Sequence, residues 1–469
     1  MKKSTTLIIS IFAFLNALTA QDITELTQLY NWDDPNIVGS SFYDNKYNEV
    51  WGFVQDGIEY GVIGSTEGTH FFDISDPSQT SELDGAFVEG KVTGGIIIHR
   101  DFHDYKGYLY AVADEGASSL QIIKLDGLPA STEVVYDSDE IFVRVHNIFI
   151  DTSQALLYAM SAKTFNGSSS MKILSLEDPE NPVEINSFPS ADLNLPTVHD
   201  GYIENGIGFF NCGYSGLYMI DFNDPINPVL LGIMDDYQQS GYNHSGWPHK
   251  TEDIYYLADE NHGLSIKVVD YSTPGDMEVV NFIDAETDYP EESIPHNLIV
   301  LDNYLYVSYY FEGVQVYDIS DAVNPVRVAE FDTYPIVDFT DDYNGNWGVY
   351  PFPGSKKLIA SDMRNGFFLF DSVEEVLNSS KENKINTLNA EVFPIPFVDR
   401  ITIKSQDMEA GTYQLSLVTV NGKQFPLQTL TISTKSFEET INIPAKLPEG
   451  MYILQLKGEN INYSKKIFK

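Results

Sequence analysis

Along most of this 469-residue chain, a turn of similar sequence recurs at regular intervals. Clear copies are Asp-Ile-Ser-Asp-Pro at residues 73–77 and Asp-Ile-Ser-Asp-Ala-Val-Asn-Pro at residues 318–325. A repeat of about 50 residues indicates that each unit is one supersecondary module, which buries its apolar face against its neighbours. The repeat therefore restricts the fold more than composition does. The equivalent positions, 46–53 residues apart, are Asp73, Lys124, Ser175, Asp221, Asp270, Asp318 and Asp371.

Each unit is expected to contain four short strands. Aspartate and serine side chains favour a tight turn, and Asn-Pro returns the chain to an extended conformation. The 29 Tyr and 28 Phe residues also favour strands. Seven such units predict an all-β protein in which residues 21–377 form a seven-bladed β-propeller. In four units a glycine stands where a hairpin must turn, at Gly68, Gly216, Gly313 and Gly366.

The two ends of this region are expected to meet. Only residues 372–377 follow the seventh turn before a polar segment begins, so the last unit lacks a fourth strand. Residues 23–30 alternate like a strand and are spare. We expect them to form the outer strand of the last blade, which closes the ring without a covalent link and covers a strand edge.

Several motifs within the units are distinctive, namely Asn48–Phe53, Arg100–Phe102, His244–Pro248, Ile294–Asn297 and Asn346–Pro351. With the Asp-Pro and Asn-Pro turns, they resemble LVIVD-type repeats and the choice-of-anchor B family of secreted proteins. The resemblance covers roughly residues 22–375. It implies a propeller and no particular biochemical role. The second unit departs from the pattern because it lacks the Asp-Pro turn, and the third has Ser175 in place of Asp.

The N-terminus is predicted to be a signal peptide over residues 1–20. Two lysines precede an apolar run over residues 7–18, and Leu-Thr-Ala at 18–20 is typical of a cleavage site. The run is shorter than the about 20 residues of a membrane-spanning helix, and no later segment is apolar enough to span. With one cysteine, Cys212, the chain has no intramolecular disulfide, so packing alone must stabilise it outside the cell.

A second domain is predicted after a polar linker over residues 378–390. Short alternating strands follow, and about 80 residues of this kind predict a small β-sandwich over residues 391–469. Its motifs are Val392–Phe397, Asn421–Lys423, Leu447–Tyr452 and Lys465–Lys469. They resemble the type A sorting domain of type IX secretion, although Ile395 stands where that domain usually has Asn. The resemblance implies the type IX machinery as a partner and an extracellular or outer cell-surface location. The alternative is a generic carbohydrate-binding sandwich.

The chain is strongly acidic, with a formal net charge of −42. From Lys381 onward there are 11 basic and 9 acidic residues, so the acidity lies almost wholly in the first 380 residues. Such a charge argues against nucleic-acid binding, which needs a basic surface, and against docking on anionic lipid. Two interpretations remain: a solvated surface that keeps an exported protein soluble, and affinity for divalent cations.

Five of the nine histidines fall at one phase of the repeat. Each is expected to begin the innermost strand of its blade, which lines the central channel. The seven equivalent positions are Trp51, His99, His146, His199, His244, His296 and Trp347. Polar residues beside them are Asp101, Asn147, Asp200, Ser245 and Asn297.

Three explanations of the histidine pattern compete. In the first, the imidazoles satisfy buried backbone groups in a narrow channel. In the second, two or three of them, with Asp101 or Asp200, bind a transition metal such as Zn²⁺. In the third, one histidine is a general base oriented by an aspartate. The sequence contains no HExxH, GxSxG or phosphate-binding glycine-rich motif.

Two acidic loops are candidate Ca²⁺ sites, although neither has EF-hand spacing. The first contains Asp338, Asp341, Asp342 and Asn344. The second is Asp259-Glu260-Asn261, and a similar pair occurs at Asp114-Glu115.

Two functions are compatible with these observations. In the first, the propeller is a secreted or surface-displayed binding module for a glycan, a peptide or another protein. In the second, it is a metal-dependent hydrolase or lyase that uses the histidine cluster. Metal content and turnover would separate the two functions, because propellers serve both roles.

Overall fold

The computed structural model describes residues 23–190, 193–287, 289–335, 343–377, 390–405, 411–419, 423–433, 436–443, 447–448, 450–457 and 462–469. It divides into two compact units, Met1–Val373 and Glu374–Lys469, and each is described by itself. The predicted signal peptide and most of the predicted linker lie outside the described residues.

The first unit is built from seven sheets, each formed largely by consecutive strands. From the innermost strand outward, three of them are β3 (Tyr47–Gln55), β4 (Ile58–Ser65), β5 (Gly68–Asp73) and β6 (Val88–Glu89); β7 (Arg100–Tyr105), β8 (Tyr108–Ala113), β9 (Leu120–Lys124) and β10 (Glu133–Ser138); and β11 (Asn147–Asp151), β12 (Leu156–Thr164), β13 (Gly167–Ser175) and β14 (Val183–Phe188). Two more are β15 (Asp200–Glu204), β16 (Ile207–Asn211), β17 (Leu217–Asp221) and β18 (Val229–Met234); and β19 (Asn243–Pro248), β20 (Ile254–Asp259), β21 (Ile266–Asp270) and β22 (Glu278–Ile283). The last two are β23 (Pro295–Leu301), β24 (Tyr304–Tyr309), β25 (Gly313–Asp318), β26 (Val326–Phe331) and β1 (Thr24–Glu25); and β27 (Asn346–Pro351), β28 (Leu358–Asp362), β29 (Gly366–Phe370) and β2 (Gln28–Trp32).

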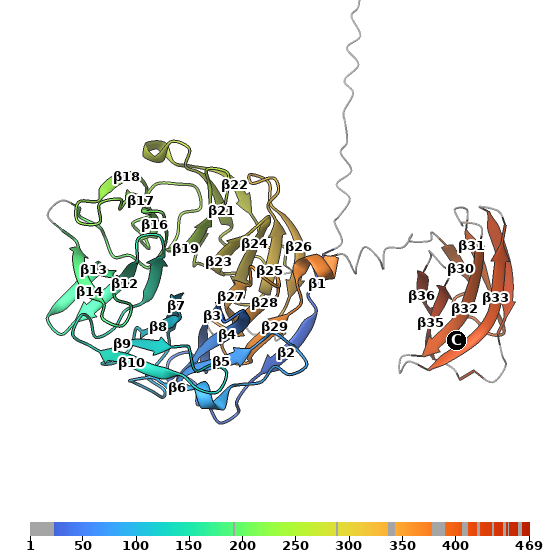
Figure 1. Cartoon of the computed structure of the whole chain (residues 1–469). Coiled ribbons are helices and arrows are strands. Elements are labelled where there is room, and N and C mark those ends of the chain that lie inside the picture. Colours follow the sequence, from blue (N-terminus) through green and yellow to red (C-terminus); the bar gives the residue numbers. More distant parts are fainter. Residues whose placement is uncertain are drawn as a thin grey trace, which may run out of the picture. The chain divides into compact units, whose positions relative to one another are not determined.

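These sheets stand around a common centre (Figure 1). The innermost strands contact one another in the order β3, β7, β11, β15, β19, β23 and β27, and β27 returns to β3. Helical structure is limited to two short 3₁₀ turns, η1 (Asp84–Ala86) and η2 (Pro274–Asp276), and a turn over residues 373–377 among the described residues. The all-β prediction is confirmed, and the four-stranded sheets agree with the propeller architecture.

The repeated aspartates are turn residues. The Oδ1 atoms of Asp73, Asp221, Asp270 and Asp318 each accept a hydrogen bond from the main-chain N–H two residues later, at 2.8–2.9 Å. This Asx geometry is why the marker aspartate recurs. In the sixth unit, Asn324 Nδ2 donates to Asp321 Oδ2 at 3.0 Å, so Asn-Pro is tied into the same turn.

The turns also connect neighbouring sheets. Tyr110 on β8 donates its hydroxyl to the main-chain oxygen of Pro179 at 2.8 Å, and Tyr256 on β20 donates to that of Ala322 at 2.9 Å. The apolar core lies between adjacent sheets: Tyr110 and Ile122, for example, pack in one cluster with Ile148 and Leu157 of the next sheet. Each unit therefore depends on its neighbours for burial.

The N-terminal segment differs from the single strand expected over residues 23–30. β1 pairs in parallel with β26 of the preceding sheet, and only β2 pairs with β29, the third strand of the last sheet. Between them the side chain of Leu26 is 2% exposed and its N–H donates to Glu330 O at 2.8 Å. Burial of Leu26 therefore fixes the point at which the chain passes from one sheet to the next.

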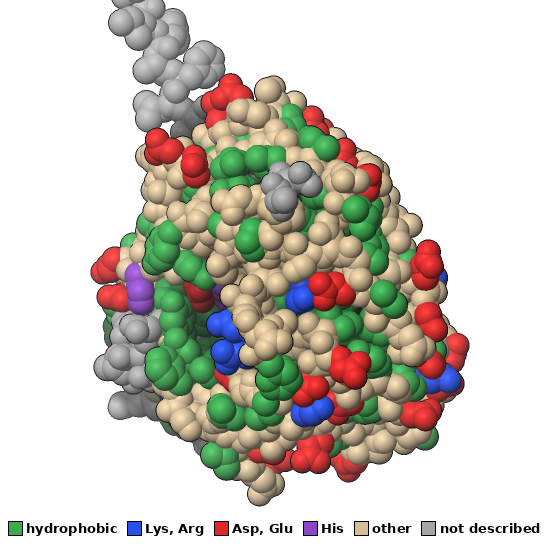
Figure 2. All heavy atoms as spheres, turned by 90° about the vertical axis from the view of Figure 1, so that its left-hand side faces the viewer, with side chains coloured by type: hydrophobic (Ala, Val, Ile, Leu, Met, Phe, Trp, Pro, Cys, Tyr) green, Lys and Arg blue, Asp and Glu red, His purple; other side chains and the backbone are tan. Residues whose placement is uncertain are grey.

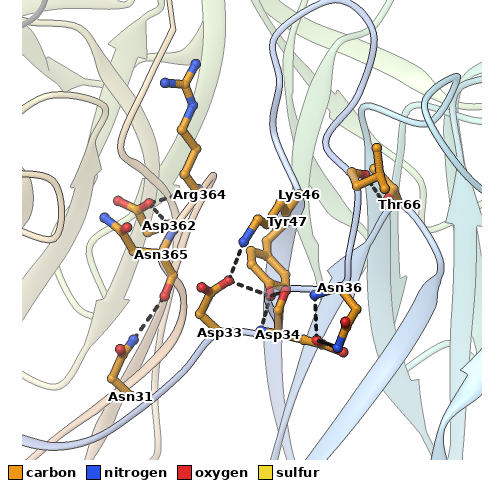
Figure 3. Close-up of polar contacts among 11 residues, drawn as sticks. Asn31, Asp33, Asp34, Asn36, Lys46, Tyr47, Thr66, Asp362, Arg364 and Asn365 are labelled. Atoms are coloured by element: carbon orange, nitrogen blue, oxygen red, sulfur yellow. Dashed lines mark hydrogen bonds and ion pairs between the residues drawn. The ribbon is translucent and has the colours of Figure 1, made fainter.

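Polar contacts hold this segment on both sides (Figure 3). Asn31 Nδ2 donates to the main-chain oxygen of Asn365 at 3.0 Å, at the end of the last hairpin. Toward the first sheet, Asp33 accepts from the hydroxyl of Tyr47 at 2.9 Å and pairs with Lys46 at 2.8 Å. The segment thereby bridges the last and first sheets of the ring.

The second unit contains two sheets. One has the order β30 (Ala390–Phe393), β31 (Arg400–Ser405) and β34 (Phe437–Asn442), and the other has the order β33 (Gln424–Ile432), β32 (Gly411–Thr419), β35 (Met451–Lys457) and β36 (Asn462–Phe468). Alternate residues of both sheets, such as Ile401, Ile403, Leu415 and Leu454, form a single apolar core. This unit thus has a core of its own.

Candidate functional site

Five imidazoles and one indole form a closed ring at the centre of the seven sheets. Successive ring centroids are 4.4 Å apart for His99 and His146, 4.1 Å for His146 and His199, and 4.1 Å for His199 and His244. The centroids of His244 and His296 are 4.4 Å apart, and those of His296 and Trp347 are 5.1 Å apart. Trp347 lies 5.7 Å from His99, which closes the ring. We call these six side chains, which lie up to 248 positions apart in sequence, the histidine ring.

Trp51, the seventh expected member, does not belong to the histidine ring. Its indole lies against His103 and Tyr350, with ring centroids 4.6 and 4.8 Å away, and its Nε1 donates to Asp104 at 2.9 Å. The reason is strand register. His244 and Trp347 are the second residues of their inner strands, whereas Trp51 is the fifth residue of β3, the position that Trp247 and Tyr350 occupy in β19 and β27.

Three cavities that share lining residues are formed by the inner strands. The histidine ring lines one of about 240 Å³, together with Glu49, Glu115, Asn147, Asp200 and Glu260. A smaller one of about 60 Å³ shares Glu49, Asn147 and Asp200 with it and adds Asp101. A third of about 510 Å³ shares Trp51, Phe149 and Trp247 with the small cavity and includes His103. Asp101 therefore lies one level below the histidine ring, and Asp200 lines both levels.

Three buried carboxyl groups face the small cavity. Burial raises the pKa of Asp101 to about 8 and that of Asp200 to about 7. Burial, reinforced by the charge of Asp101, raises the pKa of Glu49 well above its usual value. Each group accepts a hydrogen bond from a main-chain N–H: Asp101 from Ile148 at 2.6 Å, and Asp200 and Glu49 from the residue that follows each.

The imidazoles of the histidine ring differ in how readily they take up a proton. Burial, with the neighbouring imidazoles, lowers the pKa of His99, His199 and His244 well below the usual value. Burial lowers the pKa of His296 to about 3. Burial lowers that of His146 too, but the hydrogen bond and charge of Asp114, 2.9 Å from its Nδ1, outweigh burial and raise the pKa overall. Four neutral imidazoles therefore stand beside one that takes up a proton more readily.

Sequence reasoning missed the carboxylates that approach the histidine ring from neighbouring strands. Glu260 follows β20, is 13% exposed, and accepts a hydrogen bond from the hydroxyl of Tyr310 at 2.8 Å. Glu115 Oε2 accepts the main-chain N–H groups of Ile98 and His99, each at 3.0 Å. The only signal for both was the repeated Asp-Glu pair, which the sequence analysis assigned to Ca²⁺.

That assignment is corrected for both pairs. Asp259 is fully buried and forms an ion pair with Lys267 at 2.6 Å, and Asp114 binds His146. Asp259 is thus paired with an ammonium group, and Asp114 with an imidazole. Of the other candidate loop, Asp338, Asp341 and Asp342 lie outside the described residues, and Asn344 is buried.

One group in the cavity combines ligand types suited to a metal. His199, His244 and Glu260 each offer one ligand atom, and the three atoms lie within 4.8 Å of one another. Among the described residues this is the one such group of three or more. Neutral imidazole and carboxylate together suit Zn²⁺ and similar transition metals.

Comparisons with solved structures find chains of similar fold, including two at low sequence identity. One is the crystal structure of the computationally designed Ika8 protein, 11% identical, which covers 71% of this chain and 99% of that chain with a TM-score of 0.43. Another is the Pseudomonas aeruginosa periplasmic gluconolactonase PpgL, 11% identical, which covers 85% of this chain and 99% of that chain with a TM-score of 0.47. No curated protein sequence is similar to this chain.

The second unit has a clear relative. Residues 391–469 match the family model described as a secretion system C-terminal sorting domain. Within the described part of the chain, no helix is both long and apolar enough to cross a membrane. The sorting domain implies handling by the type IX secretion machinery, and the protein is exported to the extracellular space or the outer cell surface.

Proposed function

We propose that the exported chain is a seven-bladed β-propeller over residues 21–377, joined by a linker over residues 378–390 to a sorting β-sandwich over residues 391–469. Residues 1–20 are removed as a signal peptide. Seven sheets in a closed ring of contacts support the first domain, and two sheets around one core support the second. The LVIVD-type and choice-of-anchor B resemblance fits the same division.

The propeller acts as a binding module, and the cavity inside the histidine ring is its binding site. The observation that carries this proposal is the histidine ring itself, in which six aromatic side chains from six sheets surround one cavity of about 240 Å³. Packing alone does not explain this arrangement of imidazoles, because the buried Nδ1 atoms of His99 and His244 have no hydrogen-bond partner among the described residues. Buried polar atoms without partners are rare and indicate a missing ligand, ion or water.

The cavity limits what can enter it. It is smaller than the about 300–1,000 Å³ of typical small-molecule sites, so it takes one small polar unit of a larger ligand. Aromatic faces, neutral imidazoles and carboxyl groups suit a terminal sugar of a glycan or the end of a peptide. The chain is strongly acidic, and Figure 2 shows acidic side chains scattered over one face, with fewer basic ones. Cationic or neutral ligands are therefore favoured over anionic ones.

A matched pair of histidine variants tests this function. His146→Ala alters the cavity inside the histidine ring, whereas His103→Ala alters the cavity at the other level of the channel. Glycans and outer-membrane proteins are screened with the full-length secreted chain, and each hit is titrated by calorimetry. We expect His146→Ala to weaken binding at least tenfold and His103→Ala to leave it unchanged. Absence of any binding, together with turnover of an ester or phosphate, would refute the proposal.

A metal-dependent hydrolase or lyase is the second candidate function. The group formed by His199, His244 and Glu260 favours it, because two imidazoles and one carboxylate leave coordination positions open. Metal-dependent turnover of a hydrolysable substrate that disappears in His199→Ala distinguishes this candidate from pure binding. Turnover unaffected by removal of metal would exclude it.

A further inference from the structure

Glu260 is placed against two imidazole nitrogens at distances that a simple hydrogen bond does not explain. Its Oε2 is 3.6 Å from His244 Nε2, and its Oε1 is 3.9 Å from His296 Nε2. Hydrogen bonds between such atoms are about 2.7–3.2 Å long. The carboxylate is therefore close to both nitrogens without being bonded to either.

The proton on His296 Nδ1 leaves a lone pair on Nε2 opposite Glu260, and a cation between the two would be stabilised by both. The Nδ1 of His296 lies against the main-chain oxygen of Trp347, which can only accept, so Nδ1 carries the proton. In the neutral ring Nε2 then has a lone pair, and this lone pair faces Glu260. An electron pair and a carboxylate repel each other, whereas a metal ion between them would attract both. A carbonyl that fixes the tautomer is also the usual outer partner of a metal-binding histidine.

The separations are those of atoms that share one metal ion. Two ligand atoms at about 2.0–2.1 Å from Zn²⁺ lie about 3.4 Å apart when the angle between them is tetrahedral. His244 Nε2 and Glu260 Oε2, at 3.6 Å, are close to this value, and His199 completes a group within 4.8 Å. Small side-chain rotations would bring all three atoms onto one ion.

The neighbours of His199, His244 and Glu260 also fit a metal site. Tyr310 is 2% exposed and its hydroxyl donates to Glu260 Oε1, which fixes the carboxylate. His244 is 5% exposed. His99 and His146 line the same cavity, so the group borders the space that a ligand would occupy.

We propose that His199, His244 and Glu260 bind a divalent transition metal such as Zn²⁺, with His296 beside it and at least one coordination position facing the cavity. Imidazole nitrogen disfavours Ca²⁺ and Mg²⁺, which prefer oxygen ligands. Tyr310 is a positioning residue for the carboxylate. This site goes beyond the binding function and stands whether or not the cavity turns over a substrate.

The test measures metal directly and so separates the site from the binding function. The full-length secreted protein is analysed for metal, stripped with a chelator, and titrated with Zn²⁺ against a chromophoric competitor. We expect one Zn²⁺ per chain. Glu260→Gln and His244→Ala should weaken Zn²⁺ binding at least 100-fold, and Tyr310→Phe about tenfold, in the range of outer-partner effects.

His99→Ala is the matched control, because His99 belongs to the histidine ring but not to the ligand group. Its Zn²⁺ affinity should stay within about threefold of wild type, as expected for a residue that does not bind the ion. Circular dichroism checks that each variant is folded. If the ligand variants do not fold, the wild-type chain loaded with Co²⁺ decides: visible absorption typical of nitrogen and oxygen ligands supports the site. Failure of the wild-type chain to bind either ion stoichiometrically, or equal losses in His99→Ala and Glu260→Gln, would overturn it.

Discussion

Gly348 leaves the space that the side chain of Glu49 fills at the level below the histidine ring. A Cβ at this position would lie 2.2 Å from Glu49 Oε1. Through that space Glu49 extends past β27 to accept a hydrogen bond from Asn297 Nδ2 on β23 at 2.7 Å. The missing side chain thus allows a polar contact between two sheets that are not neighbours.

Replacing Gly348 should destabilise the packing of the inner strands. We expect Gly348→Ala to lower the free energy of unfolding by about 1–3 kcal/mol, the usual cost of adding a methyl group to a packed interior. Gly167→Ala on β13 is the control, since a Cβ there meets nothing within 4 Å. Urea denaturation measures both variants. Equal stability of the two would contradict this role of Gly348.

Asp101 should make stability depend on pH. Its pKa rises from 3.8 in the unfolded chain to about 8 in the folded protein, chiefly through burial. Between these values the folded state binds more protons than the unfolded state, so this group's contribution falls as the pH rises from about 4 to about 8. Asp101→Asn removes the titration and can still accept the N–H of Ile148.

The stability of Asp101→Asn relative to wild type should therefore increase with pH across that interval. We expect a gain of at least about 1.4 kcal/mol, the equivalent of one pKa unit. Chemical denaturation at a series of pH values measures it. Asp126→Asn, which changes an exposed carboxylate, serves as the control and should show no such trend. If the difference in the free energy of unfolding between Asp101→Asn and wild type did not change with pH, the carboxyl of Asp101 would be ionised in the folded state.

At the scale of the elements, β2 protects an edge that would otherwise be exposed. It covers β29, in which Phe367, Leu369 and Phe370 are fully buried. Trp32 adds aromatic contacts with Tyr47 and Phe72 of the first sheet, with centroids 5.5 and 5.2 Å away. Losing this strand would uncover backbone hydrogen-bonding groups and apolar surface together.

A mature chain that begins at residue 33 should consequently melt several degrees lower than one that begins at residue 21, and should aggregate. Loss of even about 1 kcal/mol lowers the melting temperature by several degrees in small domains and by less in larger ones. A chain that begins at residue 27, which lacks β1 and keeps β2, is the control and should lose much less. Differential scanning calorimetry and light scattering follow both. Equal melting of the three chains would show that β2 does not stabilise the ring.

The sequence predicts the elements of this fold better than their register. Period and turn chemistry are local, so Asp73 and Asp318 reveal their turns directly. Which residue of an inner strand faces which level depends on where that strand begins, and for this reason Trp51 was assigned to the wrong level. Glu260 was not predicted as a partner of the imidazoles because it follows a second strand, and only the closed ring brings it beside His244 and His296.

At the scale of the whole molecule, the two units have separate cores. A chain that ends at residue 390 should keep the melting temperature of the first unit and fail to leave the cell envelope, because the matched sorting domain is gone. Cell fractionation and calorimetry of the purified truncated chain test both parts. Truncated protein in the medium at the wild-type level would show that export does not need residues 391–469.

The pairing of β2 with β29 also governs when the ring can close. Asn31 on β2 donates to the main-chain oxygen of Asn365, which directly precedes β29, and the two residues are 334 positions apart. β2 is among the first strands to be synthesised, and it can pair only after β29 has been made near the end of synthesis. The topology therefore postpones closure of the ring of sheets until nearly the whole first unit has been made.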